Sequence, residues 1–167
     1  MKALKLLKDR LLRNQQNAIH SYLNHVELKV WKTLRVLQHL IILIFMFEKI
    51  LIATDGSKHS EKAATAAIEL SQLTKGKVTA IYVEDRDKKG IEATERIKEM
   101  AGKAGIPFEA KIVEGNPANE ILKFAEDAKM DVIVIGSIGV TGLKKFMIGS
   151  VAEKVVLHSK VPVLTVY

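Results

Sequence analysis

A glycine-rich stretch between residues 136 and 150 contains the residue types best suited to binding phosphate. It opens with Gly136-Ser137 and Gly139, and it closes with Gly149-Ser150 directly before an apolar segment typical of a helix. Glycine has no Cβ and tolerates positive φ, so its backbone N–H groups can approach an anion closely. A helix N-terminus adds unpaired N–H groups and a favourable dipole. The stretch therefore predicts a phosphate-binding loop rather than an ordinary connection.

This loop differs from the best-known nucleotide loop. That pattern requires GxxxxGK[ST], and no such run occurs in the chain. The adjacent Lys144 and Lys145 carry charge that could neutralise phosphate, although paired lysines in a loop are more often solvated. We therefore place the binding capacity in the glycines and in the helix start, and not in the lysines.

A second candidate is Asp55, which follows a short apolar run and precedes Gly56. Asp-Gly is also a common turn pair, so a purely structural role competes with ligand binding. Ligands of open parallel sheets bind at the carboxyl ends of the strands, and Asp55 stands at such an end. This position favours the functional interpretation.

The elements that must position these residues alternate regularly from Lys49 onward. Short apolar runs indicate strands, and the segments between them have helical spacing and helix signals such as Ser57 and Asn116-Pro117. Alternation of this kind predicts an α/β fold, a five-stranded parallel sheet with helices on both faces. The strands are expected at 49–54, 77–83, 108–113, 131–135 and 162–167, and the last helix at about 150–158.

Here the sequence resembles the universal stress protein family. Gly136-x2-Gly139-x9-Gly149-Ser150 matches that family's ATP-binding motif, G-x2-G-x9-G-[ST], at every fixed position. The resemblance covers about 47–167 and includes KILIATDGS at 49–57, DVIVIGS at 131–137 and VPVLTVY at 161–167. The segment 84–90 is short compared with many members. The resemblance implies the strand order 3-2-1-4-5.

The resemblance also implies roles for individual residues. The end of the first strand would contact the adenosine, Val83 would contact adenine through its backbone, and the loop would hold ribose and phosphates. Members commonly dimerise through the last strand, here 163–166, so a homodimer is expected. The expected ligand is ATP, with Mg as an open question, and no metal ligand can be assigned. The candidate nucleotide-binding residues are Ala53, Thr54, Asp55, Val83, Ile135, Gly136, Ser137, Gly139, Gly149, Ser150 and Val151.

Residues 1–46 differ in kind from the rest. They contain neither glycine nor proline, and they carry eight Lys or Arg and two Asp or Glu, a net charge of +6 out of +7 for the chain. We expect a basic helical extension, with three interpretations open: a wrongly assigned start, a docking segment, or less favourably a membrane-surface helix. Because the remaining residues are nearly neutral, a nucleic-acid partner is not expected.

Composition narrows the chemistry of the domain. The chain has no cysteine, which excludes disulfides and thiolate catalysis, and its five histidines lack metal-ligand spacing. No base is evident beside the expected phosphates, and no arginine follows Arg96. We therefore expect a cytoplasmic, ATP-binding regulatory module of the stress response without assigned catalytic residues. The alternative is a slow ATPase or another nucleotide-dependent enzyme.

Overall fold

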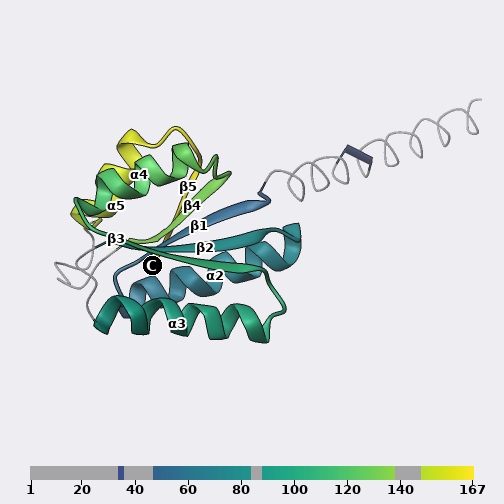
Figure 1. The fold of residues 1–167 in the computed structure, drawn as a ribbon. Helices are drawn as coiled ribbons and strands as arrows, with labels where there is room; N and C mark the ends of the chain where they lie inside the picture. Colours follow the sequence, from purple (N-terminus) through teal and green to yellow (C-terminus); the bar gives the residue numbers. More distant parts are fainter. Residues whose placement is uncertain (1–33, 36–46, 84–87, 138–147) are drawn as a thin grey trace, which may run out of the picture. The chain divides into compact units, whose positions relative to one another are not determined.

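The computed structural model describes residues 34–35, 47–83, 88–137 and 148–167. Five parallel strands form one sheet in the order β3-β2-β1-β4-β5 (Figure 1). The predicted α/β class and strand order are confirmed. The strands are β1 Lys49–Thr54, β2 Lys77–Val83, β3 Phe108–Val113, β4 Val132–Gly136 and β5 Val163–Val166, and the helices are α2 Lys58–Thr74, α3 Lys88–Lys103, α4 Pro117–Asp127 and α5 Ser150–His158.

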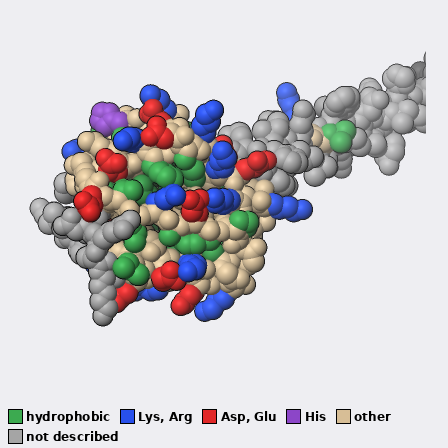
Figure 2. Space-filling model, viewed as in Figure 1, with side chains coloured by type: hydrophobic (Ala, Val, Ile, Leu, Met, Phe, Trp, Pro, Cys, Tyr) green, Lys and Arg blue, Asp and Glu red, His purple; other side chains and the backbone are tan. Residues whose placement is uncertain are grey.

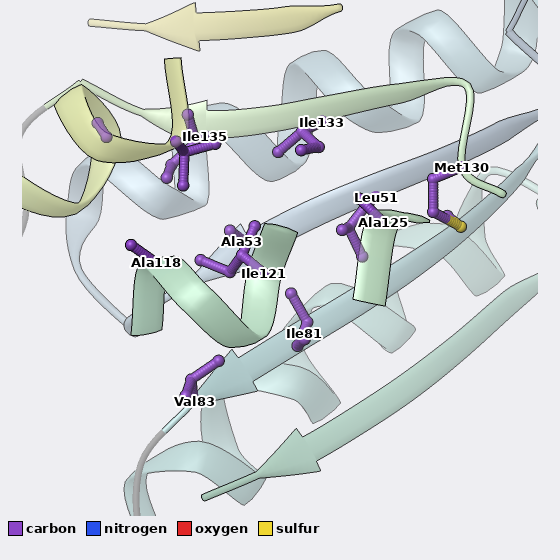
Figure 3. Packing of buried hydrophobic residues seen from close by; sticks show 12 residues of the cluster. Leu51, Ala53, Ile81, Val83, Ala118, Ile121, Ala125, Met130, Ile133 and Ile135 are labelled. Carbon is purple, nitrogen blue, oxygen red and sulfur yellow. The ribbon is translucent and has the colours of Figure 1, made fainter. Parts of the chain in front are cut away.

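Helices cover both faces of the sheet, with α4 and α5 on one face and α2 and α3 on the other (Figure 1). Alternate residues of each strand point to opposite faces. In β1, Leu51 and Ala53 therefore join the core under α4 and α5, while Ile50 and Ile52 join the core over α2. Figure 3 shows the first of these cores, where Ile121 of α4 lies over the strands. The central strands are buried on both faces, which explains their continuous apolar sequences.

Side-chain caps fix where two helices begin. The Ser57 hydroxyl accepts a hydrogen bond from the Ser60 N–H at 3.2 Å, and α2 starts at the next residue. The side-chain Oδ1 of Asn116 accepts from the Asn119 N–H at 3.3 Å, and Pro117 occupies the first turn of α4. Both caps confirm the sequence predictions. Capped starts at these points place the first turns of α2 and α4 at the carboxyl edge of the sheet.

The predicted boundaries differ from the observed ones by small amounts. β1, β2 and β3 have the predicted bounds, whereas β4 is shifted by one residue and β5 is shorter at both ends. The helix α3 begins at Lys88, inside the short segment 84–90 that follows β2. In its first turn Gly90 lies close against Tyr82 of β2, a contact that no local pattern reveals.

The chain divides into two compact units, Met1–Ile42 and Leu43–Tyr167. Within the first unit the structure describes Leu34 and Arg35, which are helical and exposed. The remaining residues of the predicted extension lie outside the described ones, so its nature stays a prediction. Among the described helices, none is long and apolar enough to cross a membrane.

Charges of both signs are interspersed over the visible face of the second unit (Figure 2). Several of them pair: Lys77 and Lys111 flank Glu109, and Lys160 contacts Glu126 at 3.0 Å. This pattern agrees with the near-neutral composition of the domain sequence.

Candidate nucleotide-binding cleft

A cleft of about 290 Å³ opens at the carboxyl ends of β1, β2 and β4. This is the edge at which parallel sheets bind ligands, beside the point where the strand order reverses between β1 and β4. Apolar side chains from the strands and from α4 line it, together with polar groups from the strand ends and from the helix starts. The lining residues among those described are Ala53, Thr54, Asp55, Ser60, Ile81, Tyr82, Val83, Lys89, Pro117, Ile121, Ile135, Gly136, Gly149, Ser150, Val151 and Ala152.

The N-terminus of α5 forms one wall of this cleft. Its N-cap is Gly149, with φ −67° and ψ 148°, and no side chain caps the helix. The first N–H groups of a helix have no partner within the helix, so those of Ser150, Val151 and Ala152 can meet a ligand. All three residues line the cleft. Of the helices that begin at this edge, α2 and α4 have side-chain caps, whereas α5 has none.

Gly136 has a packing role that the sequence did not reveal. A Cβ built on Gly136 would lie 3.0 Å from the His59 carbonyl carbon and 3.1 Å from the Ser60 nitrogen. Both atoms belong to the backbone at the start of α2, which cannot move aside as a flexible side chain could. Glycine at 136 therefore lets the end of β4 approach the first turn of α2 and closes one side of the cleft.

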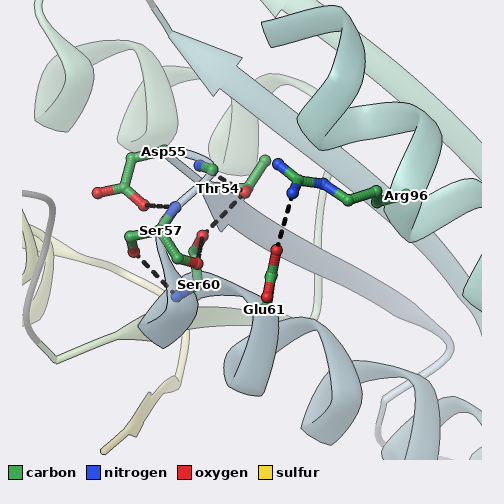
Figure 4. Close-up of polar contacts among 7 residues, drawn as sticks. Thr54, Asp55, Ser57, Ser60, Glu61 and Arg96 are labelled. Atoms are coloured by element: carbon green, nitrogen blue, oxygen red, sulfur yellow. Dashed lines mark hydrogen bonds and ion pairs between the residues drawn. The ribbon is translucent and has the colours of Figure 1, made fainter. Parts of the chain in front are cut away.

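The turn after β1 is held by a group of short polar side chains (Figure 4). The Asp55 carboxylate accepts a hydrogen bond from the Ser57 N–H at 3.0 Å. The Thr54 hydroxyl donates to the Ser60 hydroxyl at 3.1 Å and accepts from the Gly56 N–H at 3.2 Å. Gly56 has φ +72°, a conformation that favours glycine. Asp55 thus serves the turn, as the structural interpretation expected, while it also lines the cleft.

Ser137 lies immediately behind the cleft. Its N–H donates to the Val166 carbonyl at 2.8 Å, and its carbonyl accepts from the Gly149 N–H at 2.7 Å. The side chain is fully buried, and its hydroxyl has no hydrogen-bond partner among the described residues. Ser137 is not among the lining residues. Its observed contacts join β4 to β5 and to the start of α5.

The structure brings most of the predicted site together. Nine of the eleven predicted residues line the cleft: Ala53, Thr54, Asp55, Val83, Ile135, Gly136, Gly149, Ser150 and Val151. Ser137 is buried behind it, and Gly139 lies outside the described residues, as do Lys144 and Lys145. Whether these residues bind a nucleotide stays a prediction.

Sequence reasoning missed several lining residues. Pro117 and Ile121 come from α4 and follow the helix start that the sequence did signal, so their position after a strand end could have identified them. Lys89 had no such signal. It reaches the cleft because α3 begins early and packs against β2.

Comparison with known proteins places these features in one family. The model described as "Universal stress protein family" matches residues 46–104 and 84–167. Universal stress protein MJ0531 of Methanocaldococcus jannaschii is 39% identical, over 72% of this chain and 82% of its own length. The solved structure of MJ0577 is 34% identical with a TM-score of 0.63, over 72% of this chain and 96% of that one. A universal stress protein family protein from Arabidopsis thaliana, solved with AMP bound, has 21% identity and a TM-score of 0.57. The match covers 70% of this chain and 89% of that one.

Proposed function

We propose that this chain, which belongs to the universal stress protein family, binds an adenine nucleotide, ATP in particular. The binding site is the cleft at the carboxyl edge of the sheet. The N-terminus of α5 carries this proposal, because its first residues line the cleft, no side chain caps it, and the first N–H groups of a helix have no partner within the helix. The AMP-bound relative from Arabidopsis thaliana supports the class of ligand.

The cleft fits the two chemically different halves of a nucleotide. Phosphate oxygens would accept hydrogen bonds from the N–H groups of Ser150, Val151 and Ala152, where the helix dipole also favours negative charge. The base would pack between apolar side chains such as Val83 and Ile121, which line the interior. Binding sites of this kind are commonly apolar with a few placed polar groups.

We propose that Gly139, a residue of the predicted motif that lies outside the described ones, also contacts the phosphates. It belongs to the proposed motif, because glycine there would let the backbone approach the phosphates. The proposal includes Mg only as an ion bound together with ATP. Within the described ranges no group of three or more Asp, Glu or His side chains could hold a metal ion, and we assign it no protein ligand.

We infer a binding and regulatory role in the stress response rather than rapid catalysis. Phosphoryl transfer requires a positioned nucleophile and charge compensation. Asp55 is the one carboxylate among the described lining residues, and its oxygen already accepts from the Ser57 N–H. A single-turnover assay with labelled ATP separates the two roles, because bound nucleotide that yields no product over hours would exclude the slow ATPase.

The regulatory proposal includes a homodimer formed through β5. This strand lies at an edge of the sheet, where unpaired backbone groups can join a second sheet. Leu164 of β5 and Tyr167 beyond it expose 42% and 67% of their surface, and Leu157 of α5 exposes 69%. A second copy covering these apolar side chains would bring two clefts into one assembly.

One substitution tests the nucleotide site directly. Ser150→Glu puts a carboxylate in the first turn of α5, where it favours the helix by about 0.3–1 kcal/mol and repels a phosphate at the same place. We expect the variant to stay folded and to lose ATP binding in calorimetry. Gln72→Glu is the matched control, because it adds the same charge at an exposed position of α2 that does not line the cleft. Equal ATP affinity for wild type and Ser150→Glu would contradict the proposal.

A further inference from the structure

We propose that Lys89 is a ligand-contacting residue of the cleft and that, together with Asp55, it binds the sugar hydroxyls of the nucleotide. This inference rests on the proposed function and assigns a residue that the glycine-rich motif does not contain. Lys89 and Asp55 are the two charged side chains among the described lining residues. One offers hydrogen-bond donors only and the other, when ionised, offers acceptors only.

Gly90 allows Lys89 to reach the cleft, and Gly56 shows where its side chain lies. A Cβ built on Gly90 would lie 2.6 Å from two ring carbons of Tyr82, so glycine is what lets the first turn of α3 rest on that buried ring. On the other side, a Cβ built on Gly56 would be 3.5 Å from the Lys89 Cε and 3.8 Å from its Cγ. The aliphatic part of Lys89 therefore lies beside Gly56, the residue that follows Asp55.

The Lys89 ammonium is available to a ligand. Its side chain is exposed, and in the described part of the chain no ion pair or hydrogen bond involves it. The neighbouring α3 residues differ, since Arg96 pairs with Glu61 at 3.2 Å (Figure 4) and Lys98 with Glu95 at 3.0 Å. A lysine in the cleft lining with no partner among the described residues can donate to a bound molecule at little cost.

The arrangement of the elements assigns Lys89 to the sugar rather than to the phosphates. The helix α3 packs on β2 and β3, whereas α5 packs on α4 and β5. In the strand order β3-β2-β1-β4-β5 these helices stand on opposite sides of β1. Phosphates held at the N-terminus of α5 therefore leave the nucleoside toward β1 and β2, where Asp55 and Lys89 lie.

A pair of sugar hydroxyls matches this donor and acceptor. Each hydroxyl can donate one hydrogen bond and accept others. The Asp55 carboxylate can accept from one hydroxyl while the Lys89 Nζ donates to a hydroxyl oxygen. The base, whose faces are apolar, fits better against Ile81 and Val83 in the interior of the cleft. The pair would thus distinguish a nucleotide that carries its sugar hydroxyls from one that lacks them.

The test compares AMP with 2′,3′-dideoxy-AMP on the full chain by calorimetry, for wild type, Lys89→Met and Lys98→Met. Lys98→Met removes the same charge from the same helix at a position outside the cleft. We expect Lys89→Met to lower the affinity for AMP about three- to tenfold, the range for one hydrogen bond, and to leave the affinity for dideoxy-AMP unchanged. Lys98→Met should bind both ligands as wild type does.

The outcomes separate this inference from the proposed function. Wild type that binds none of ATP, AMP and 2′,3′-dideoxy-AMP would refute both. If wild type binds AMP and Lys89→Met binds it with the same affinity, the role of Lys89 is overturned and the proposed function still holds. If Lys89→Met loses the same factor of affinity for AMP and for dideoxy-AMP, the assignment of Lys89 to the sugar is also overturned, because the lysine would then act on the phosphates or the base.

Discussion

The N–H of Gly149 donates a 2.7 Å hydrogen bond to the carbonyl oxygen of Ser137, although residues 138–148 lie between them in sequence. This single bond joins the end of β4 to the start of α5. It fixes where the uncapped helix N-terminus begins relative to the cleft. The two ends of the glycine-rich motif are therefore neighbours in the fold, and the motif can act as one site.

Gly149→Pro should weaken nucleotide binding by removing this hydrogen bond. The φ of Gly149 is −67°, which proline adopts without strain, so the substitution mainly deletes the N–H donor. We expect about three- to tenfold weaker ATP binding, as for the loss of one hydrogen bond, in a calorimetric titration. Gly149→Ala is the control, since it adds a Cβ and keeps the donor. Equal loss in both variants would show that the bond itself is unimportant.

Gly90→Ala should destabilise the protein, because the added Cβ would overlap the Tyr82 ring at 2.6 Å. Overpacking of this kind costs about 1–3 kcal/mol in the free energy of unfolding. Gly102→Ala in the same helix meets nothing within 4 Å and should be neutral or stabilise by up to about 1 kcal/mol. Urea denaturation measures both. Similar stabilities for the two variants would contradict the described start of α3.

The stability of the protein should fall between about pH 4.5 and pH 2 because of Glu109. Hydrogen bonds from Lys111 and then from Lys77 lower the pKa of this carboxyl from 4.5 to about 2. A depressed carboxyl pKa stabilises the folded state above the unfolded pKa, and this contribution disappears as the pH falls through the folded pKa. Solvent screening keeps the effect small, because both partners are partly exposed.

Thermal denaturation of Glu109→Gln against pH checks this assignment. The variant should lack part of the wild-type decrease in melting temperature over this range, and it should differ least from wild type at pH 2. Glu69→Gln, an exposed position on α2, controls for the loss of one negative charge. Parallel pH profiles for wild type and Glu109→Gln would show that Glu109 does not carry the effect.

Leu164→Lys should convert the proposed dimer into a monomer. The substitution places a charge in the exposed apolar surface of the edge strand β5, and charged residues discourage pairing between strand edges. Sedimentation velocity gives the oligomeric state. Leu73→Lys serves as the control, since Leu73 is exposed to 70% on α2, away from β5. A monomeric wild type, or a dimer that survives Leu164→Lys, would reject this interface.

Much of the architecture was predictable because its signals are local. The buried strands are continuous apolar runs, and Ser57 and Asn116 cap α2 and α4 by contacts with residues three positions away. The position of Lys89 was not predictable, since it depends on how closely α3 approaches Tyr82 of a different element. The packing contact of Gly136 was not predictable for the same reason: it is made with the backbone of α2, far away in sequence.

The sequence by itself determined the alternation of strands and helices, and with it the edge of the sheet at which Asp55 and Gly149-Ser150 would meet. Periodicity and capping act within a few residues, so a single chain displays them directly. Only the tertiary structure decided that Ser137 lies behind the cleft and that Lys89 lies on its rim. Those positions follow from packing between elements distant in sequence, where a Cβ would overlap the Tyr82 ring at Gly90 and crowd the α2 backbone at Gly136.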